Sequence, residues 1–247
     1  MKNDILYLVM PAYNEQDNIK SVIVQWYPVV EKIGGDSILL IVNDGSKDNT
    51  YKILLDLQKD YPQLKAIDKP NSGHGATLIF AYQNAIKAGA DFIFQTDSDG
   101  QTDPDEFWLF WENRHKYDFQ IGNRCKREDG QGRIFVTRVL RIILWLIFRV
   151  SVVDANTPFR LMNADRLNAI LQVVPKDFFL ANVLITTIAV KWEERFIWYP
   201  VTFKPRQAGV NSINFKRIIK IGVKSLKDFG MINKRLKQDV KTLNHHQ

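Results

Sequence analysis

The most informative part of the chain is Asp91–Gln101, which reads Asp-Phe-Ile-Phe-Gln-Thr-Asp-Ser-Asp-Gly-Gln. It begins as a short apolar strand and ends in a loop that carries Asp97 and Asp99. Two carboxylates of this kind, together with substrate phosphates, usually hold Mg²⁺ or Mn²⁺ in proteins. The alternative is an Asp-rich turn that caps a helix starting at Pro104, with Asp103 as the N-cap. The position of the pair at the carboxyl end of a strand favours the metal site.

Three more apolar segments with the pattern of strands precede this one. They are Ile5–Met10, Ser37–Val42 and Leu64–Asp68. Amphipathic helical patterns separate them, and one of these runs from Thr50 to near Tyr61 with Asn49 as its expected N-cap. Fully apolar strands that alternate with helices predict an α/β fold with a parallel sheet covered on both faces. Ligands of such sheets bind beyond the carboxyl ends of the strands, so each strand-end loop is a candidate site.

The second half of the chain is less regular. We expect a short strand at Phe119–Ile121, an apolar helix that includes Ile142–Phe148, a turn at Asn156–Pro158 followed by further helices, and a β-rich segment at Phe196–Phe203. From Phe215 onward the pattern is helical and basic. No internal repeat or interdomain linker is visible.

The composition excludes several classes of protein. The 247 residues are 45% hydrophobic and 25% charged, which excludes a disordered or collagen-like chain. The single cysteine, Cys125, cannot form an internal disulfide and suggests a reducing compartment. The N-terminal segment, with Lys2 and Asp4 before a short apolar run that ends at Pro11, does not resemble a signal peptide.

Two segments raise the question of a membrane. Ile142–Phe148 lies between Arg141 and Arg149 and is too short to cross a bilayer, so the helix around it is either a core helix or a helix in the membrane interface. Residues 216–241 hold nine Lys and Arg against two Asp, which accounts for the whole net charge of +7. This basic amphipathic tail either binds an anionic membrane surface or packs on the domain as a solvated helix.

Four motifs occur in order along the chain: Val9–Glu15, Asn43–Thr50, Asn71–Ala76 and Asp97–Gln101. They resemble the motifs of family-two glycosyltransferases, and within that family the dolichol-phosphate mannosyltransferase and polyprenyl-phosphate glycosyltransferase branch. The resemblance implies the GT-A nucleotide-diphospho-sugar transferase fold, an α/β fold with a mostly parallel central sheet and helices on both faces. It also implies a catalytic domain over residues 1–215, with a nucleotide-sugar part at 1–123 and an acceptor part at 124–215. The basic tail would then cover 216–247.

The resemblance implies roles for individual residues. Those that bind the donor are Pro11, Tyr13, Glu15, Asp44, Asp97 and Gln101. Asp97 and Asp99 would hold Mg²⁺ or Mn²⁺. The catalytic set comprises Asp99, Arg124, Arg133 and Arg206, and the acceptor set comprises Arg133, Thr137 and Ser212. The chain departs from the family pattern at Thr157-Pro158, which replaces the usual Ser-Gly before Phe159-Arg160, and at one extra residue between Gly209 and Ser212.

The implied function is an inverting glycosyltransferase. It would move a sugar from a GDP- or UDP-linked donor to a polyprenyl or dolichyl phosphate, as a peripheral enzyme on the cytoplasmic, inner face of the cell membrane. An acceptor phosphate is already an anionic nucleophile, whereas a glycan hydroxyl needs a general base, for which Asp177 is the candidate. Transfer to a glycan hydroxyl is the alternative. A non-catalytic nucleotide- or nucleic-acid-binding module is a third hypothesis, which the carboxylate pair and the absence of a nucleic-acid motif disfavour.

Overall fold

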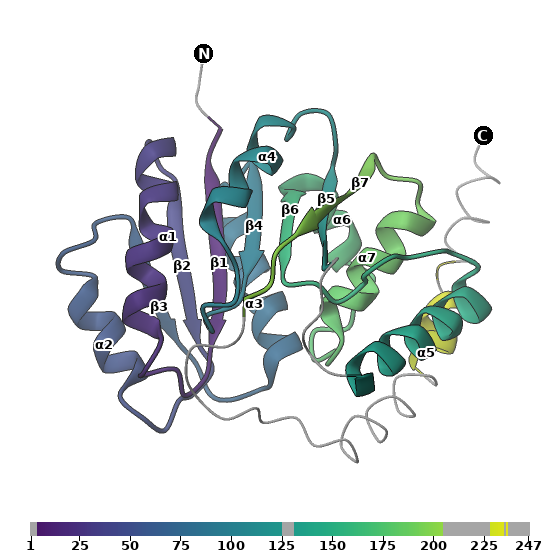
Figure 1. Cartoon of the computed structure of the whole chain (residues 1–247), viewed down its shortest axis with the longest axis horizontal. Coiled ribbons are helices and arrows are strands. Elements are labelled where there is room, and N and C mark those ends of the chain that lie inside the picture. The colour runs from purple at the N-terminus through teal and green to yellow at the C-terminus, as the bar shows by residue number, and fades with distance from the viewer. Residues whose placement is uncertain (1–3, 125–130, 205–227, 235, 237–247) are drawn as a thin grey trace.

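The protein is described here by a computed structural model that covers residues 4–124, 131–204, 228–234 and 236, with backbone alone at 131–136. One seven-stranded sheet has the strand order β3-β2-β1-β4-β6-β5-β7 (Figure 1). The strands are β1 (Leu6–Ala12), β2 (Ile38–Asn43), β3 (Leu64–Asp68), β4 (Phe92–Thr96), β5 (Phe119–Arg124), β6 (Phe159–Asn163) and β7 (Phe196–Val201).

Helices connect the strands along most of the chain. They are α1 (Ile19–Ile33), α2 (Thr50–Leu57), α3 (His74–Lys87), α4 (Phe107–Glu112), α5 (Gln131–Phe148), α6 (Ala164–Leu171) and α7 (Ala181–Lys191). The expected start at Pro104 is a short 3₁₀ turn, Pro104–Glu106, that leads into α4, and Asp103 caps it by accepting a hydrogen bond from the Asp105 backbone. None of the helices in the described ranges is both long enough and apolar enough to span a bilayer.

The sheet is mostly parallel, as predicted, with one exception. Strands β1, β2, β3 and β4 run parallel, and β5 pairs in parallel with β7. Strand β6 lies antiparallel between β4 and β5. The sequence pattern predicts only helices after the turn at Asn156–Pro158, and strand β6 shows that this prediction is wrong for Phe159–Asn163. Arg160 interrupts the apolar pattern there, yet its side chain is fully buried.

Both faces of the sheet are covered, which confirms the predicted layers. Alternate residues of β1 show why: Tyr7 and Val9 pack into one core cluster, and Leu6 and Leu8 pack into the other. Helices α1, α2 and α4 contribute to the second cluster, and α3, α5, α6 and α7 to the first. The alternation follows from the period of two in a strand, so a continuous apolar run supplies two cores at once.

The last described segment packs on the domain. Phe229, Ile232 and Leu236 are buried in the same cluster as α5 and α7, and the Phe229 ring lies edge-on to Phe148, 5.6 Å between centroids. The expected boundary between a catalytic domain and a tail at residues 215 and 216 lies outside the described residues.

Candidate functional site

The carboxyl ends of β1, β2, β3 and β4 meet at one edge of the sheet, the lower edge in Figure 1. Three of the four motifs span or directly follow these strand ends, and the Asn71–Ala76 motif runs from the loop after β3 into the first turn of α3. The parallel register aligns Ala12 with Asn43 and Asn43 with Asp68, so residues far apart in the sequence share this edge. The sequence prediction that the strand-end loops form a single site is consistent with this topology.

The Asp97–Gln101 loop is tied to the rest of the site through its buried middle residue. Ser98 is buried, and its Oγ donates a hydrogen bond of 2.8 Å to the carbonyl oxygen of Pro11 at the end of β1. Asp97 and Asp99, on either side of Ser98, are half-buried. Asp99 Oδ1 also accepts a 3.2 Å bond from the Gln101 backbone, which closes the turn. The loop therefore holds two carboxylates in a fixed arrangement beside the first strand.

A chain of buried amides orients Asp97. Gln95 Nε2 donates to Asp97 Oδ1 over 3.1 Å, and Gln95 Oε1 accepts from Asn182 Nδ2 over 3.0 Å. The Tyr82 hydroxyl donates to Asn182 Oδ1, also over 3.0 Å. Burial raises the pKa of Tyr82, so its hydroxyl keeps its proton and acts as the donor. The sequence prediction does not include these residues, although polar side chains within apolar runs are a signal for them.

Arg160 is a cation in the interior behind this network. Its guanidinium donates to the carbonyl oxygens of Thr157 and Ala155, over 2.6 Å and 3.3 Å, and to Thr186 Oγ1 over 3.2 Å. Burial lowers the pKa of Arg160 to about 10, so the side chain stays charged near neutral pH. Asp154 and Asp97 favour that charge from nearby.

Asp44 organises the neighbouring loop. Its buried carboxylate forms an ion pair with Lys69 and accepts backbone hydrogen bonds from Ser72, at 2.9 Å, and Gly73, at 3.0 Å. Burial acts to raise the pKa of Asp44, but the bonds from Lys69 and Ser72 outweigh it and the pKa is lowered. Asp44 therefore fixes the Asn71–Ala76 motif against β2 while it is ionised.

Gly45 is required beside Asp44. Its φ of +64° is in the region that favours glycine, and an added Cβ would lie 2.8 Å from the Asn71 backbone nitrogen. The two loops thus approach each other more closely than a side chain at residue 45 would permit.

The residues expected to hold the nucleotide base lie at the end of β1. Pro11 is buried, Tyr13 is exposed, and Glu15 is buried with its carboxylate accepting a 2.8 Å bond from Asn18 Nδ2. The Glu15 backbone also donates to Thr50 Oγ1 at the start of α2. Tyr13 is thus the side chain of these three that is open to a ligand.

Gln101 binds the end of the segment that follows β7. Its Nε2 donates to the Lys204 carbonyl over 2.9 Å, and the Lys204 backbone donates to the Gln101 carbonyl over 2.8 Å. Lys204 also forms a 2.7 Å ion pair with Asp103. Residue 204 is therefore fixed on the carboxylate loop, two positions before Arg206 in the sequence. Arg206 and Ser212 lie outside the described residues.

Arg124 has a carboxylate partner of its own. Its Nε and Nη2 each donate over 2.8 Å to the buried carboxylate of Asp154, and its guanidinium lies over the Phe203 ring. This bidentate pair fixes the plane of the guanidinium. Arg133 and Thr137 both belong to α5, where Thr137 is half-buried and the Arg133 side chain is not described.

The carboxylate pair fits a divalent cation held jointly with a ligand. Within the described ranges, no group of three or more His, Cys, Asp and Glu side chains is arranged to hold a metal by itself. Asp97 and Asp99 supply two hard oxygen ligands, and Mg²⁺ or Mn²⁺ commonly combines such a pair with substrate phosphates and water. The residues present therefore fit a metal that arrives with a diphosphate.

Comparison with known families identifies the chain. The family model for glycosyl transferase family 2 matches residues 7–170, a range that contains all four motifs. The chain belongs to glycosyltransferase family 2. The resemblance expected from the motifs is thereby confirmed.

Two relatives illustrate this family's range. A UDP-N-acetylglucosamine–dolichyl-phosphate N-acetylglucosaminyltransferase of Methanococcus voltae is 34% identical over 191 residues, which cover 69% of this chain and 74% of the relative. An undecaprenyl-phosphate 4-deoxy-4-formamido-L-arabinose transferase of an Enterobacter species is 27% identical over 223 residues. That match covers 87% of this family-2 chain and 64% of the relative's length.

Solved structures support the GT-A fold of this family-2 glycosyltransferase. Glucosyl-3-phosphoglycerate synthase from Mycobacterium tuberculosis with UDP matches with a TM-score of 0.64 and 15% identity, over 94% of this chain and 80% of that one. The same synthase with Mn²⁺, UDP and glucosyl-3-phosphoglycerate matches with a TM-score of 0.60 and 16% identity, over 94% and 76%. At this identity the likeness shows the fold alone.

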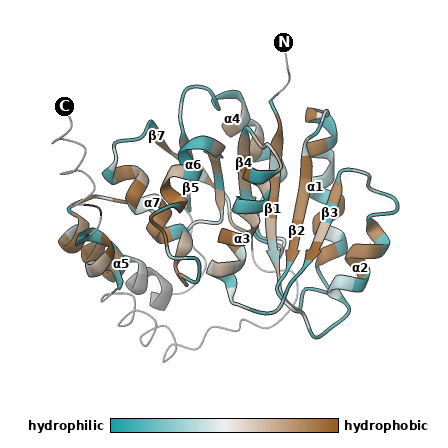
Figure 2. Cartoon of the chain, turned by 180° about the vertical axis from the view of Figure 1, so that it is seen from behind, coloured by the Kyte–Doolittle hydropathy of each residue, from teal (hydrophilic) through white to brown (hydrophobic). Residues whose placement is uncertain are grey.

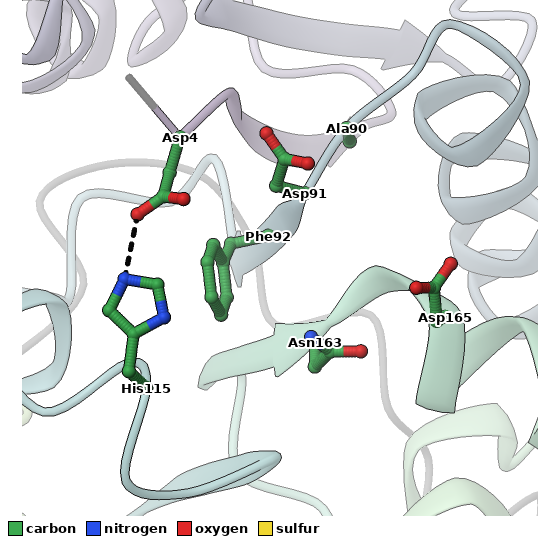
Figure 3. A pocket seen from close by; sticks show the side chains of 7 residues that line it. All are labelled: Asp4, Ala90, Asp91, Phe92, His115, Asn163 and Asp165. Atoms are coloured by element: carbon green, nitrogen blue, oxygen red, sulfur yellow. Dashed lines mark ion pairs between the residues drawn. The ribbon is translucent and has the colours of Figure 1, made fainter. Parts of the chain in front are cut away.

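A cavity at the opposite edge of the sheet contains none of the predicted site residues. It has a volume of about 220 Å³ and lies beside the start of β4 and the end of β6 (Figure 3). Asp4 and His115 form a 3.0 Å contact there, and Asp91 accepts a 2.8 Å bond from the Ile5 backbone. These polar groups stabilise the sheet at the end remote from the motif loops.

Proposed function

We propose that this protein transfers a sugar from a nucleotide-diphosphate sugar to a polyprenyl or dolichyl phosphate, with inversion at the anomeric carbon. The observation that carries the proposal is the carboxylate pair Asp97 and Asp99 at the end of β4, hydrogen-bonded through Ser98 to the end of β1, in a family-2 chain. The names of the two relatives, which transfer sugars to dolichyl and undecaprenyl phosphate, support a lipid phosphate as acceptor. The Methanococcus relative favours UDP over GDP as the nucleotide.

In the proposed reaction, an acceptor phosphate oxygen forms a bond to the anomeric carbon as the bond to the nucleoside diphosphate breaks. Mg²⁺ or Mn²⁺ would supply charge stabilisation for the leaving diphosphate. Asp97 and Asp99 would hold that ion, while Pro11, Tyr13, Glu15, Asp44 and Gln101 would position the nucleotide. Arg124, oriented by Asp154, and Arg206 would bind developing negative charge, and Arg133, Thr137 and Ser212 would bind the acceptor phosphate.

Transfer to a glycan hydroxyl is the second candidate, because a carboxylate lies near the same edge. Asp177 is exposed and precedes Phe178 and Phe179, whose backbone lies against Gly75 in the first turn of α3. An added Cβ at Gly75 would be 2.2 Å from the Phe178 carbonyl oxygen, so the two segments are in direct contact. A hydroxyl acceptor would need such a base, whereas a phosphate acceptor would not.

The test is a transfer assay with the full chain, Mn²⁺ and a panel of UDP- and GDP-sugars. Polyprenyl phosphate and a soluble glycan serve as the two acceptors. We expect product with polyprenyl phosphate, and a loss of at least about 100-fold in Asp97→Asn and Asp99→Asn. Asp103→Asn is the matched control, since Asp103 belongs to the same loop but pairs with Lys204. Full activity in Asp97→Asn and Asp99→Asn would overturn the proposal. So would a wild-type chain that glycosylates the glycan but not polyprenyl phosphate, and that loses this glycan transfer in Asp177→Asn.

We also propose that the enzyme acts on the inner face of the cell membrane, with residues 216–241 attracted to anionic lipid. Phe229, Ile232 and Leu236 are buried in the domain, so deletion of the whole tail would expose part of the core. Neutralising Lys216, Lys220 and Lys224 with glutamine tests the charge without that damage. We expect weaker binding to anionic vesicles, and unchanged binding would contradict a role for the tail.

A further inference from the structure

The outward side of α5 is unusually apolar for an exposed helix. Its inward residues Leu144 and Phe148 are buried in the core. On the other side, four large apolar side chains keep a substantial exposed fraction: Val139 38%, Ile142 58%, Trp145 53% and Leu146 53%. Contiguous exposed apolar surface of this kind marks an interaction site in soluble proteins. Figure 2 shows much of α5 as hydrophobic at the rim of the molecule.

The charges on this side of α5 have a single sign. Arg138, Arg141 and Arg149 are exposed beside the apolar residues. Residues 131–153 contain no Asp or Glu at all. The Arg149 guanidinium lies 5.3 Å from the centre of the Trp145 ring. A shallow hollow of about 370 Å³ opens here, lined by Arg138, Arg141, Ile142, Trp145, Ser151 and Val152.

Hydrogen bonds hold the C-terminal end of α5 on the domain, so its outward side is exposed without a change in the position of the helix. Lys191 Nζ donates to the Phe148 carbonyl over 3.0 Å, and Asn233 Nδ2 donates to the Ile147 carbonyl over 2.6 Å. These bonds satisfy carbonyl groups that the last turn of a helix leaves free. Arg149 then ends the helix with a positive φ of 61°.

We propose that the outward side of α5 lies in the headgroup layer of an anionic membrane. Tryptophan and aliphatic side chains partition into the boundary between headgroups and acyl chains, and arginines bind lipid phosphates. The uniform positive charge selects this occupant. A second copy of the chain would bring the same arginines together, and a nucleic acid would leave the apolar side chains in water. In this arrangement α5 lies along the membrane surface, with its apolar side chains toward the acyl chains and its arginines among the headgroups.

A membrane-bound α5 extends the proposed function and rests on it at one point, the binding of the acceptor phosphate by residues of this helix. Thr137 and Arg133, the proposed acceptor-phosphate residues, belong to the same helix as Ile142 and Trp145. A helix in the headgroup layer would lie at the depth where a lipid phosphate is found. Vesicle binding itself needs neither donor nor acceptor, so its failure is distinguishable from failure of the transfer reaction.

The test is flotation of the full chain with vesicles of phosphatidylcholine alone, and of phosphatidylcholine mixed with phosphatidylglycerol. We expect Ile142→Ser/Trp145→Ser to weaken binding to the mixed vesicles by at least about tenfold, because two anchoring side chains are lost. The matched control is Val24→Ser/Leu55→Ser, which changes two exposed apolar residues on α1 and α2. Arg138→Gln/Arg141→Gln should abolish the preference for phosphatidylglycerol.

Two kinds of outcome would overturn the inference. One is binding that does not distinguish the α5 variant from the control variant, whether both lose binding equally or neither loses any. The other is a dimeric wild-type chain that becomes monomeric in Ile142→Ser/Trp145→Ser, measured by light scattering, since a second copy would then be the occupant. A circular dichroism spectrum and melting temperature close to those of the wild type show that the α5 variant is folded. The wild type and the α5 variant Ile142→Ser/Trp145→Ser should use a short-chain, water-soluble acceptor phosphate equally well.

Discussion

At the residue scale, the orientation of Asp97 depends on side chains that never reach the substrate edge. Gln95 is fully buried within β4, and Asn182 is buried at the start of α7. Together they connect a carboxylate in a loop to a helix almost ninety positions later in the chain. Such outer partners fix the geometry of metal-binding carboxylates and commonly alter metal affinity when they are removed.

We therefore predict that Asn182→Leu weakens the apparent affinity for Mn²⁺ by about tenfold in the transfer assay, because Gln95 Oε1 loses the hydrogen bond that Asn182 Nδ2 donates to it. Titration of Mn²⁺ at saturating donor measures the effect. Thr187→Val is the control on the same helix, since the buried Thr187 hydroxyl donates to the Val183 carbonyl within α7. An equal shift in Thr187→Val would mean that general destabilisation, and not the amide chain, is responsible.

The residues at the strand ends could be predicted from the sequence, whereas the buried partners that orient them could not. Asp44, Asp97 and Asp99 follow apolar strands, so their gathering at one edge could be predicted from the order of strands. Gln95 and Asn182 could not be assigned to Asp97, because their hydrogen-bond partners are distant in sequence. Arg133, Arg206 and Ser212 stay predictions from the family resemblance, as their side chains lie outside the described residues.

At the element scale, strand β6 and the N-cap of helix α2 differ from what the local sequence pattern predicts. Strand β6 was missed because its pattern contains Arg160, a residue that is rarely buried unless carbonyl and hydroxyl groups satisfy its guanidinium. Helix α2 does begin at Thr50, but Asn49 makes no capping bond with its side chain. Asp48 Oδ1 accepts the Thr50 backbone bond over 3.0 Å in its place.

The start of α3 should be the least tolerant element of the site edge. We predict that Gly75→Ala destabilises the fold by at least about 2 kcal/mol, because a Cβ would overlap the backbone carbonyls of Phe178 and Phe179. Urea denaturation of the purified chain measures the change. Gly230→Ala is the control, because Gly230 is helical with open space around it.

Gly230→Ala should be stabilising by about 0.5–1 kcal/mol, since alanine has the higher helix propensity. If the two alanine variants have the same unfolding midpoint, the contact between α3 and the Phe178–Phe179 segment does not exist in solution.

At the scale of the whole molecule, ionised carboxylates should set the acid limit of stability. A hydrogen bond from Arg195 lowers the pKa of Asp118, where β5 and β7 begin, and one from Lys204 lowers that of Asp103. The net pKa of Asp44 is lowered as well. A carboxyl whose folded-state pKa is depressed stabilises the fold above its unfolded pKa, and that contribution is lost as the pH falls through the folded value.

We accordingly predict that these carboxylates leave the melting temperature nearly constant from pH 7 to pH 5. Below about pH 4 the melting temperature should fall, because Asp side chains of the unfolded chain take up protons there. Asp118→Asn should lower the melting temperature at pH 7 and make its decline in acid shallower. Differential scanning calorimetry at pH 7, 5, 4 and 3 compares the two proteins. Parallel declines in both would show that Asp118 is not among the responsible groups.

The molecular architecture could be predicted in its layers and in the first four strands, because continuous apolar runs that alternate with helices permit few other arrangements. The order of the strands in the second half of the sheet could not be predicted. An antiparallel strand between β4 and β5 depends on pairings between Phe92–Thr96 and Phe159–Asn163 that no local pattern encodes.

The hydrogen bond from Ser98 to the Pro11 carbonyl joins the loop proposed to bind the cation with the strand end proposed to bind the base. Any ligand that displaces one of these segments therefore also strains the other. Such a connection amounts to a coupling free energy between two binding events, and equilibrium couplings are reciprocal. Divalent ion and nucleotide should accordingly change each other's affinity by the same factor, and that coupling should decrease in Ser98→Ala.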